Sequence, residues 1–313
     1  MRILIATFLF AVAAVAIFAD SGTTDIYFHR TLAFFGIRPT VTVMIGGDIQ
    51  LDRYIRQVSD RNGPDFVFSC IDDTLASADA VVANLEGPIT DNPSVSVGTD
   101  VDELDNYRFT FPPDSAERLF KHHIGIVGLG NNHTLNYGYD GVRSTIRYLD
   151  DAGVSYFGDP FDYRVASSSI GGVPLAFISY NEFSDEGAQA SAKRALVQIV
   201  QARADSFVPV VFAHWGEEYA DASPQMHDLA HAFVDAGAQF VVGSHPHVIE
   251  EHEWYKGVPI YYSLGNFIFD QYWSDTVTHG LLLSATFSKD GITNIKEIPI
   301  ELEKDGRTCL SAI

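Results

Sequence analysis

Positively charged side chains are scarce in this sequence of 313 residues. It contains 20 Lys and Arg against 41 Asp and Glu, which gives a formal net charge of −21, and it has no basic stretch. Binding to nucleic acid requires clustered Lys and Arg that neutralise phosphates, and docking on an anionic membrane surface requires the same charges. We therefore expect no nucleic-acid partner, and we interpret the acidic surface as one that keeps the protein soluble.

Cysteine is nearly absent, and no internal repeat is found. The two cysteines, Cys70 and Cys309, stand far apart and form no Cys-x-x-Cys pair, which excludes a zinc knuckle and a disulfide framework. We expect two unpaired thiols, with a bridge between them as the open alternative. No unit of about 20–50 residues recurs, which excludes a solenoid.

One long apolar run stands at the start of the chain. Arg2 precedes an uninterrupted apolar segment from Ile3 to Ala19, and Asp20 ends it. The length is compatible with a signal peptide or an N-terminal membrane anchor, so residues 1–19 predict export. The protein would be secreted or anchored on the extracellular face of the membrane. Residues 20–40 would form a spacer, residues 41–303 the folded domain and residues 304–313 a C-terminal tail.

After the spacer, short β-branched runs alternate with segments of helical periodicity. This alternation predicts an α/β layered fold. A hairpin pattern near the end of the chain, with its turn at residues 289–291, predicts a mixed sheet or two sheets packed face to face. Gly46-Gly47 predicts a tight loop after the first strand, and residues 90–107 predict a long surface loop. The expected strands cover residues 41–45, 80–83, 124–129, 173–179, 207–213, 240–242, 260–264, 281–287 and 293–302. The expected helices cover residues 64–76, 113–122, 139–152, 188–204 and 224–236.

The side chains with useful chemistry come directly after predicted strands. In an α/β sheet such positions form the ligand-binding loops, and carboxylates, imidazoles and amide oxygens are ligands of hydrolytic metal centres. Two imidazoles two residues apart in extended backbone point the same way, so His245 and His247 form the strongest single signal. Each other cluster alone is also compatible with a turn, a helix start or a core histidine, but together they predict one metal site. The clusters contain Asp48, Asn84 and Glu86, residues 130–133, His214, and His245 with His247.

These motifs resemble those of the bacterial CapA, or PgsA-type, family of capsule and poly-γ-glutamate biosynthesis proteins. The resemblance covers roughly residues 41–290. That family is similar in turn to the calcineurin-like metallophosphoesterases, which implies a four-layer α/β/β/α sandwich with mixed sheets and two metal ions. The motifs are Gly47-Asp48, Asn84-Leu85-Glu86-Gly87-Pro88, Gly130-Asn131-Asn132-His133, His214-Trp215-Gly216-Glu217-Glu218, Gly243-Ser244-His245-Pro246-His247 and the run from Ser263 to Asp270.

The resemblance implies a role for each matching residue. Glu86 would bridge the two ions and take part in catalysis, and Asp48 and His247 would complete one ion's ligand set. His133 would be the general acid or would stabilise the transition state. The implied cofactor is one or two divalent ions, Mn, Fe or Zn. The second ion would be held by Asn132, His214 and His245.

One position departs from the phosphoesterase pattern. The first motif of those enzymes is Asp-x-His, whereas this chain has Asp48-Ile49-Gln50. Glutamine is a poorer ligand than histidine, so we expect one tight and one labile metal site. Residues expected to contact substrate or to support the ligands are Gln50, Asn84, Glu217, Asn266 and Asp270.

The resemblance implies metal-dependent hydrolysis or transfer on an envelope polymer, such as a glutamyl polymer, or on a phosphorylated envelope precursor. Two alternatives stay open. One is a non-catalytic, membrane-tethered scaffold that binds membrane-bound proteins of capsule synthesis and export. The other is a generic metallophosphatase, which differs only in its substrate.

Four further histidines stand on predicted helices. His227 and His231 have the i, i+4 spacing that could bind a metal, but no carboxylate accompanies them in the pattern. We interpret them as an exposed helix face. His122 and His123 stand at a helix end, where a positive charge is favoured by the helix dipole.

Overall fold

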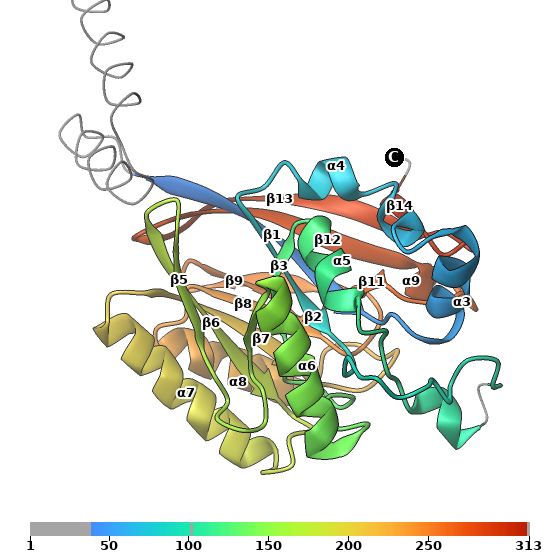
Figure 1. The fold of residues 1–313 in the computed structure, drawn as a ribbon. Helices are drawn as coiled ribbons and strands as arrows, with labels where there is room; N and C mark the ends of the chain where they lie inside the picture. The colour runs from blue at the N-terminus through green and yellow to red at the C-terminus, as the bar shows by residue number, and fades with distance from the viewer. Residues whose placement is uncertain (1–38, 101–102, 312–313) are drawn as a thin grey trace, which may run out of the picture.

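The structure is a computed structural model that describes residues 39–100 and 103–311. Two β-sheets pack face to face, and helices cover the outer face of each sheet (Figure 1). This arrangement is the expected four-layer α/β/β/α sandwich with mixed sheets. The predicted signal or anchor segment, residues 1–19, lies outside the described residues. Within the described ranges, no helix has the length and apolar character needed to span a membrane.

The first sheet has eight strands. Its parallel part consists of neighbouring strands β1 to β4, and its antiparallel part continues from β1 through β12 and β13 to β14, while β11 pairs with the end of β1. The bounds are β1 Thr40–Ile49, β2 Ala80–Leu85, β3 Ile124–Gly128, β4 Ser155–Phe157, β11 Asn266–Ile268, β12 His279–Ser288, β13 Gly291–Leu302 and β14 Thr308–Leu310.

The second sheet has six strands in the order β5-β6-β7-β8-β10-β9. Its four central strands run parallel, and the two edge strands, β5 and β9, pair antiparallel with their neighbours. The bounds are β5 Ala166–Ile170, β6 Val173–Asn181, β7 Val208–His214, β8 Phe240–Ser244, β9 His252–Tyr255 and β10 Val258–Tyr261.

The helices form the two outer layers. Helices α3, α4, α5 and α6 pack on the eight-stranded sheet, and α7 and α8 pack on the six-stranded sheet (Figure 1). Helix α8 begins at a Ser223 cap followed by Pro224, and it ends at Gly237 with φ +117°, a conformation that suits glycine. The bounds are α3 Arg53–Asn62, η1 Phe66–Phe68, α4 Asp72–Leu75, η2 Leu104–Tyr107, α5 Ser115–Lys121, α6 Gly138–Ala152, α7 Ala188–Ala204, α8 Pro224–Ala236 and α9 Asp275–Thr278.

Strand β1 is buried on both faces, as a central strand of such a sandwich must be. Val43 and Ile45 point into the core between the two sheets, whereas Met44 points into the core under the outer helices. This alternation follows from the two-residue period of a strand. Strand β1 therefore packs against the second sheet on one face and against the outer helices on the other.

The predicted loop at Gly46-Gly47 is wrong, because β1 continues through both glycines to Ile49. They permit a close approach of β11. A Cβ added to Gly47 would lie 1.9 Å from the carbonyl oxygen of Gly265, and one added to Gly46 would lie 2.7 Å from the Phe267 ring. The absence of side chains at the two glycines therefore lets the segment after β10 pack against the end of β1.

The predicted helix over residues 64–76 is also wrong. This region contains only the short turns η1 and α4, while the longer helix α3 precedes it. The buried residues of the region, such as Phe68, Ile71 and Leu75, give it a helix-like apolar pattern. Helix α3 is rich in polar residues and buries only Ile55, Val58 and Ser59. Few apolar residues therefore mark its position in the sequence.

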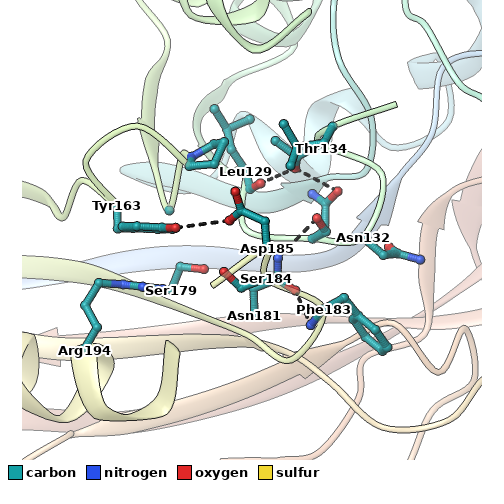
Figure 2. Close-up of a pocket in the computed structure, with 14 residues that line it drawn as sticks. Leu129, Asn132, Thr134, Tyr163, Ser179, Asn181, Phe183, Ser184, Asp185 and Arg194 are labelled. Carbon is teal, nitrogen blue, oxygen red and sulfur yellow. Dashed lines mark hydrogen bonds between the residues drawn. The ribbon is translucent and has the colours of Figure 1, made fainter. Parts of the chain in front are cut away.

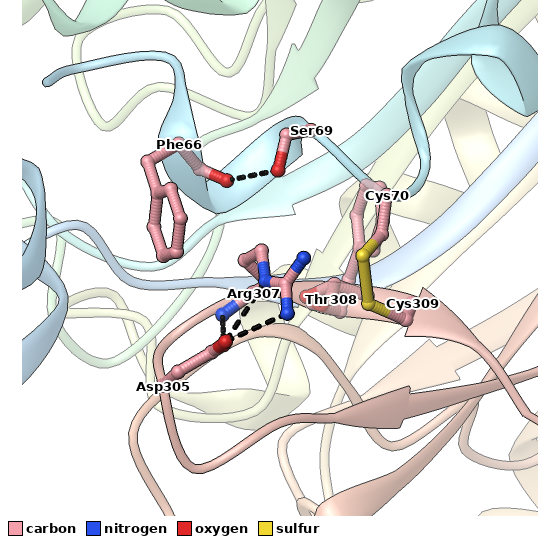
Figure 3. Close-up of a disulfide and its surroundings, with 8 residues drawn as sticks. Phe66, Ser69, Cys70, Asp305, Arg307, Thr308 and Cys309 are labelled. Carbon is pink, nitrogen blue, oxygen red and sulfur yellow. Dashed lines mark hydrogen bonds and ion pairs between the residues drawn. A yellow bond between two sulfur atoms is a disulfide. The ribbon is translucent and has the colours of Figure 1, made fainter. Parts of the chain in front are cut away.

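The expectation of two free thiols is wrong, because Cys70 and Cys309 form a disulfide (Figure 3). The bridge joins the turn before α4 to strand β14, across 239 residues of sequence. Spacing alone carries no information on a pair this far apart, since only the folded chain brings the two residues together. Strand β14 pairs with β13, so the eight-stranded sheet extends into the predicted C-terminal tail.

Candidate metal centre

The predicted ligands lie at the carboxyl ends of parallel strands in both sheets. Asp48 is the second-last residue of β1, Glu86 directly follows β2, and His214 ends β7. His245 and His247 follow β8. Because parallel strands end at the same edge, each sheet delivers its ligands to one side of the sandwich.

In the part of the chain that the structure describes, two groups of side chains have atoms close enough to hold metal ions. In each group, one potential ligand atom per residue lies within 4.8 Å of the others, and every member is buried. Glu86 belongs to both groups. The first group is Glu86, His214 and His245, and the second is Asp48, Glu86 and His247.

Glu86 is a buried acid whose side chain lacks a hydrogen-bond partner among the described residues. Its side chain is fully buried and neither carboxylate oxygen accepts a hydrogen bond. Burial, and then the charge of Asp48, raise the pKa of Glu86 well above its ordinary value. A buried, unpaired carboxylate is costly, and bound cations would supply the missing partners. The residues present therefore fit a divalent metal centre.

Asp48 is anchored by several donors. The Asn84 amide nitrogen donates to Oδ1 (2.7 Å), the His245 backbone nitrogen donates to Oδ2 (3.1 Å), and His247 Nδ1 lies 3.4 Å from Oδ2. Burial alone would raise the pKa of Asp48, but the hydrogen bond and charge of His247 outweigh it and hold the pKa below the ordinary range. Asp48 is thus ionised, as a metal ligand must be.

The two imidazoles of the first group are neutral at physiological pH. Burial, and then the neighbouring His245, lower the pKa of His214 well below its ordinary value. Burial, and then His247, lower the pKa of His245 to about 4. His214 Nε2 lies 2.9 Å from Asn132 Oδ1, which brings the predicted amide ligand beside this group. Neutral imidazoles keep the lone pair that a metal needs.

His247 is oriented by Asn266. Its Nδ1 lies 3.0 Å from Asn266 Oδ1, and its Nε2 lies 3.8 Å from Glu86 Oε1. Because an amide oxygen only accepts, Nδ1 donates to it, and this contact turns Nε2 toward Glu86. Asn84 and Asn266, two of the residues predicted to contact substrate or support the ligands, thus form hydrogen bonds with Asp48 and His247, respectively.

The expected extended backbone between His245 and His247 is not observed. Both residues have positive φ, +97° and +60°, in the segment that follows β8. Positive φ is strained for a non-glycine residue and is concentrated at functional sites. The two imidazoles therefore reach different groups, with ring centroids 6.0 Å apart.

His133 lies beside the two groups and belongs to neither. Its Nδ1 is 3.1 Å from Asn136 Oδ1, and its Nε2 is 3.9 Å from Glu86 Oε1. The Phe109 ring packs against it with a centroid distance of 4.3 Å. Burial lowers the pKa of His133 to about 4, so the ring is neutral and its Nε2 is a proton acceptor.

Three further predicted residues, Gln50, Glu217 and Asp270, also lie outside both groups. The Gln50 side-chain oxygen accepts from the Asp52 backbone nitrogen (3.3 Å), while its amide nitrogen is buried and has no partner among the described residues. Glu217 is exposed. Asp270 forms an ion pair with Arg53 and accepts from the Tyr54 backbone nitrogen (3.0 Å).

Arg53 is a site residue that the sequence reading missed. Its guanidinium lies 5.0 Å from the Phe109 ring centroid and 5.5 Å from that of Phe269. These rings contact His133 and His247, respectively. Arg53 also has positive φ, +47°. The available signal was a lone arginine soon after Asp48, in a chain where cations are rare.

Other histidines have carboxylate partners that the sequence reading did not foresee. Glu253 lies 3.5 Å from His227 and 2.8 Å from His231, and these contacts pair β9 with α8. His122 contacts Asp65 and Asp72 and stacks on Phe68, so side-chain pairing accounts for it better than the helix dipole does.

Comparison with known proteins gives relatives that are named for PGA biosynthesis, capsule biosynthesis or polyglutamine synthesis. The chain is 29% identical over 276 residues to the PGA biosynthesis protein CapA of Bacillus subtilis, which covers 82% of this chain and 70% of that protein. It is 28% identical over 284 residues to the capsule biosynthesis protein CapA of Bacillus anthracis, covering 84% and 68%. A probable polyglutamine synthesis accessory protein of Mycobacterium tuberculosis is 24% identical over 283 residues, with 74% of each chain covered.

The model of one family matches residues 42–271. This range begins in β1 and includes every residue of the two metal-ligand groups. The chain therefore belongs to the family of bacterial capsule synthesis proteins, PGA_cap.

Proposed function

We propose that this protein is a metal-dependent hydrolase or transferase that acts on a capsule polymer or on its precursor. The observation that carries the proposal is Glu86, a buried carboxylate that has no hydrogen-bond partner among the described residues and is shared by two groups of metal-ligand type. A structural acid would be paired or solvated. Two divalent ions, when bound at such a site, activate water and polarise the bond to be cleaved.

The ligand assignment follows the two groups. Asp48, Glu86 and His247 would hold one ion, and Glu86, His214 and His245 the other. Asn132 would add its amide oxygen to the group of Glu86, His214 and His245, since it already contacts His214. Asn84 and Asn266 would orient the ligands through hydrogen bonds to Asp48 and His247.

Two residues of this chain would act on the substrate directly. His133 has a free Nε2 on the Glu86 side of its ring, where it would take up a proton and return it to a leaving group. Arg53, fixed by Asp270 and by Asn106 Oδ1 (3.0 Å), would offer positive charge to an anionic group of the substrate.

The substrate assignment rests on the relatives, two of which are named for capsule or PGA biosynthesis. An anionic polymer would meet a protein of net charge −21. Long-range repulsion would oppose its approach, so bound cations would be its local anchor. The Cys70–Cys309 disulfide supports export, because such bonds persist in oxidising compartments.

The test uses the purified chain loaded with Mn²⁺, Fe²⁺ or Zn²⁺. Elemental analysis should give up to two ions per chain, and γ-glutamyl peptides or phosphodiesters should be cleaved. Glu86→Ala should lose both ions and the activity, whereas the exposed control Glu103→Ala should retain them. A chain that binds metal but cleaves neither class of compound would refute the enzymatic proposal.

One observation favours a scaffold as the second candidate. Gln50 stands where the phosphoesterases have a ligand histidine, and its side chain belongs to neither ligand group. A scaffold for membrane-bound capsule synthesis or export proteins would keep its partners and support polymer export after Glu86→Ala. An enzyme would stay folded and lose product.

A further inference from the structure

A pocket adjoins the first ligand group, between the loops that follow β3, β4 and β6 (Figure 2). Two of its lining residues also touch metal-ligand side chains. Asn132 contacts His214, and the Phe183 ring centroid lies 4.3 Å from that of His245. A chemical group bound in this pocket would therefore lie next to the Glu86, His214 and His245 group.

Two glycines let the strand ends close around this pocket. A Cβ on Gly130 would lie 2.0 Å from the Ser179 hydroxyl oxygen, and one on Gly158 would lie 2.4 Å from the Ser179 Cβ. Gly158 also has φ +77°. The floor of the pocket is thus built by a close approach of β3, β4 and β6, and it does not depend on a surface loop alone.

Asp185 presents a fixed carboxylate to the pocket. One oxygen accepts from the Tyr163 hydroxyl (3.2 Å), and the other accepts from the Tyr139 hydroxyl. Figure 2 shows this carboxylate in the middle of the lining side chains. Two carboxylate oxygens have about four acceptor positions, so capacity remains for a ligand.

The cation of the pocket is Arg194. Its guanidinium forms an ion pair with Glu186, donates to the Ser191 hydroxyl (3.1 Å) and lies 3.5 Å from the Tyr163 ring centroid, while its Nε has no hydrogen-bond partner among the described residues. Among the described residues, no Lys, Arg or His lies within ion-pair distance of Asp185. Because Asp185 and Glu186 together outweigh the one guanidinium, the side chains of the pocket carry an excess of negative charge.

The surroundings have the same sign. Glu182 is exposed beside Phe183, and its carboxylate accepts from the Gly216 backbone nitrogen (2.8 Å) at the end of the His214 segment. Glu218 is exposed and close enough to raise the pKa of Glu86, after the effects of burial and of Asp48. These carboxylates repel an anionic group and attract a cationic group, and their charge is opposite to that of the cations that would anchor an anionic polymer at the metal centre.

We propose that this pocket is a substrate subsite for a primary ammonium group, which Asp185 holds beside the His214 and His245 side of the metal centre. The inference rests on the proposed function, because the metal centre would act on the bond next to this group. An ammonium has three directional N–H donors. Asp185 supplies the charged acceptor, and the Phe183 ring supplies an aromatic surface that attracts cations.

The subsite narrows the substrate class of the proposed enzyme. A polymer bound only through carboxylates would have nothing to place in this pocket. The ligand instead carries an amino group near the reacting bond, either at the free amino end of a peptide-like chain or on a basic side chain.

The test compares two ligands that differ only at the amine. γ-Glutamyl methylamide has a free α-amino group, and its N-acetyl derivative does not. Calorimetric titration of the Mn²⁺-loaded full chain should give an affinity at least about tenfold higher for the amine, which is the size of one charge-assisted hydrogen bond. Asp185→Asn should abolish this preference while leaving the affinity for the acetylated ligand unchanged.

A matched control separates the subsite from the general acidity of the protein. Asp140 is an exposed acid at the start of α6 that pairs with Arg143 and does not line the pocket. Asp140→Asn removes the same charge and should change the preference by less than about twofold. Equal binding of both ligands by the unaltered chain, or an unchanged preference in Asp185→Asn, would overturn the proposal.

The result is distinguishable from failure of the proposed function, since binding is measured without turnover. An amine preference with no cleavage of any substrate would retain the subsite and remove the hydrolase. Cleavage without an amine preference would do the reverse. Competition by Nα-acetyl-lysine methylamide separates the two sources of the amine: displacement of γ-glutamyl methylamide indicates a basic side chain, and its absence indicates a free amino end.

Discussion

The two ligand groups that share Glu86 are built differently. The group with His214 and His245 takes both imidazoles from the six-stranded sheet and adjoins a polar pocket. The group with Asp48 takes its carboxylate from the eight-stranded sheet, and Asn84 and Asn266 fix its side chains. The first group thus combines side chains of metal-ligand type with an adjoining pocket, whereas the second has side chains fixed by hydrogen bonds and does not include Gln50, which stands where the phosphoesterases have a histidine.

Among the variants that test this difference between the groups, loss of the shared ligand Glu86 should have the largest effect on metal binding and activity. Glu86→Gln should abolish binding at both groups and lower activity by at least about a hundredfold. It should also stabilise the metal-free protein at neutral pH, on the order of 1 kcal/mol, because an unpaired buried carboxylate is removed. Elemental analysis and chemical denaturation measure these two effects. Retention of one full equivalent of metal would contradict the shared position of Glu86.

The two groups should respond unequally to loss of one imidazole. His214→Ala should remove an ion from the group that retains Glu86 and His245, and His247→Ala should remove one from the weaker group. Since we expect the weaker site to be partly filled at low metal, His247→Ala should change the stoichiometry less than His214→Ala. Titration with Mn²⁺ checks this order, and the opposite order would reverse the assignment of tight and labile sites.

Position 50 offers a way to make the two groups more alike. Gln50→His restores the Asp-x-His spacing of the phosphoesterases beside Asp48. We expect the weaker site to bind metal about tenfold more tightly, because an imidazole is a better ligand than an amide. Gln50→Asn serves as the control for loss of the native contact with Asp52. No gain with His over Asn would mean that the residue at position 50 cannot reach the ion.

The smallest expected effect is on the pH dependence of stability, and it arises from Glu250 in the segment that follows His247. Burial, then Asp221 and Glu251, raise the pKa of Glu250 to about 8, from an ordinary value near 4.5. The neutral form is therefore favoured in the folded state. The resulting destabilisation is absent below pH 4.5, grows as the pH rises through the interval to 8 and is constant above it.

Replacing Glu250 should remove this pH dependence. Glu250→Gln should raise the free energy of unfolding at about pH 9 by on the order of 1 kcal/mol, and it should leave stability near pH 4 unchanged. Denaturant titrations at both pH values provide the measurement. A gain of equal size at low pH would show that the cause is packing and not ionisation.

The layered fold and the places of the ligands were predictable because they depend on local patterns. Apolar runs marked most of the strands, and the residues that follow them, such as Glu86 and His214, gather at one edge by the geometry of parallel strands. The ends of strands were less accurate. Gly46-Gly47 has the appearance of a turn in sequence, and its role in admitting β11 is visible only once Gly265 and Phe267 are in place.

Features that depend on pairs distant in sequence were not predictable. Asp270 had the appearance of a substrate or support residue, but its partner Arg53 stands more than two hundred residues earlier. The carboxylate next to His231 comes from another element, β9. The pairing of Cys70 with Cys309 follows the same logic, since nothing near either residue indicates the other.

The Cys70–Cys309 bridge has a consequence for synthesis of the chain. Cys309 is made 239 residues after Cys70, so Cys70 can find its native partner only after β14 has been translated and has reached β13. A free Cys70 thiol would thus identify a product that stops before Cys309 or in which β14 has not yet docked. A thiol-reactive label would then distinguish molecules with a free Cys70 from molecules in which Cys70 is bridged to Cys309.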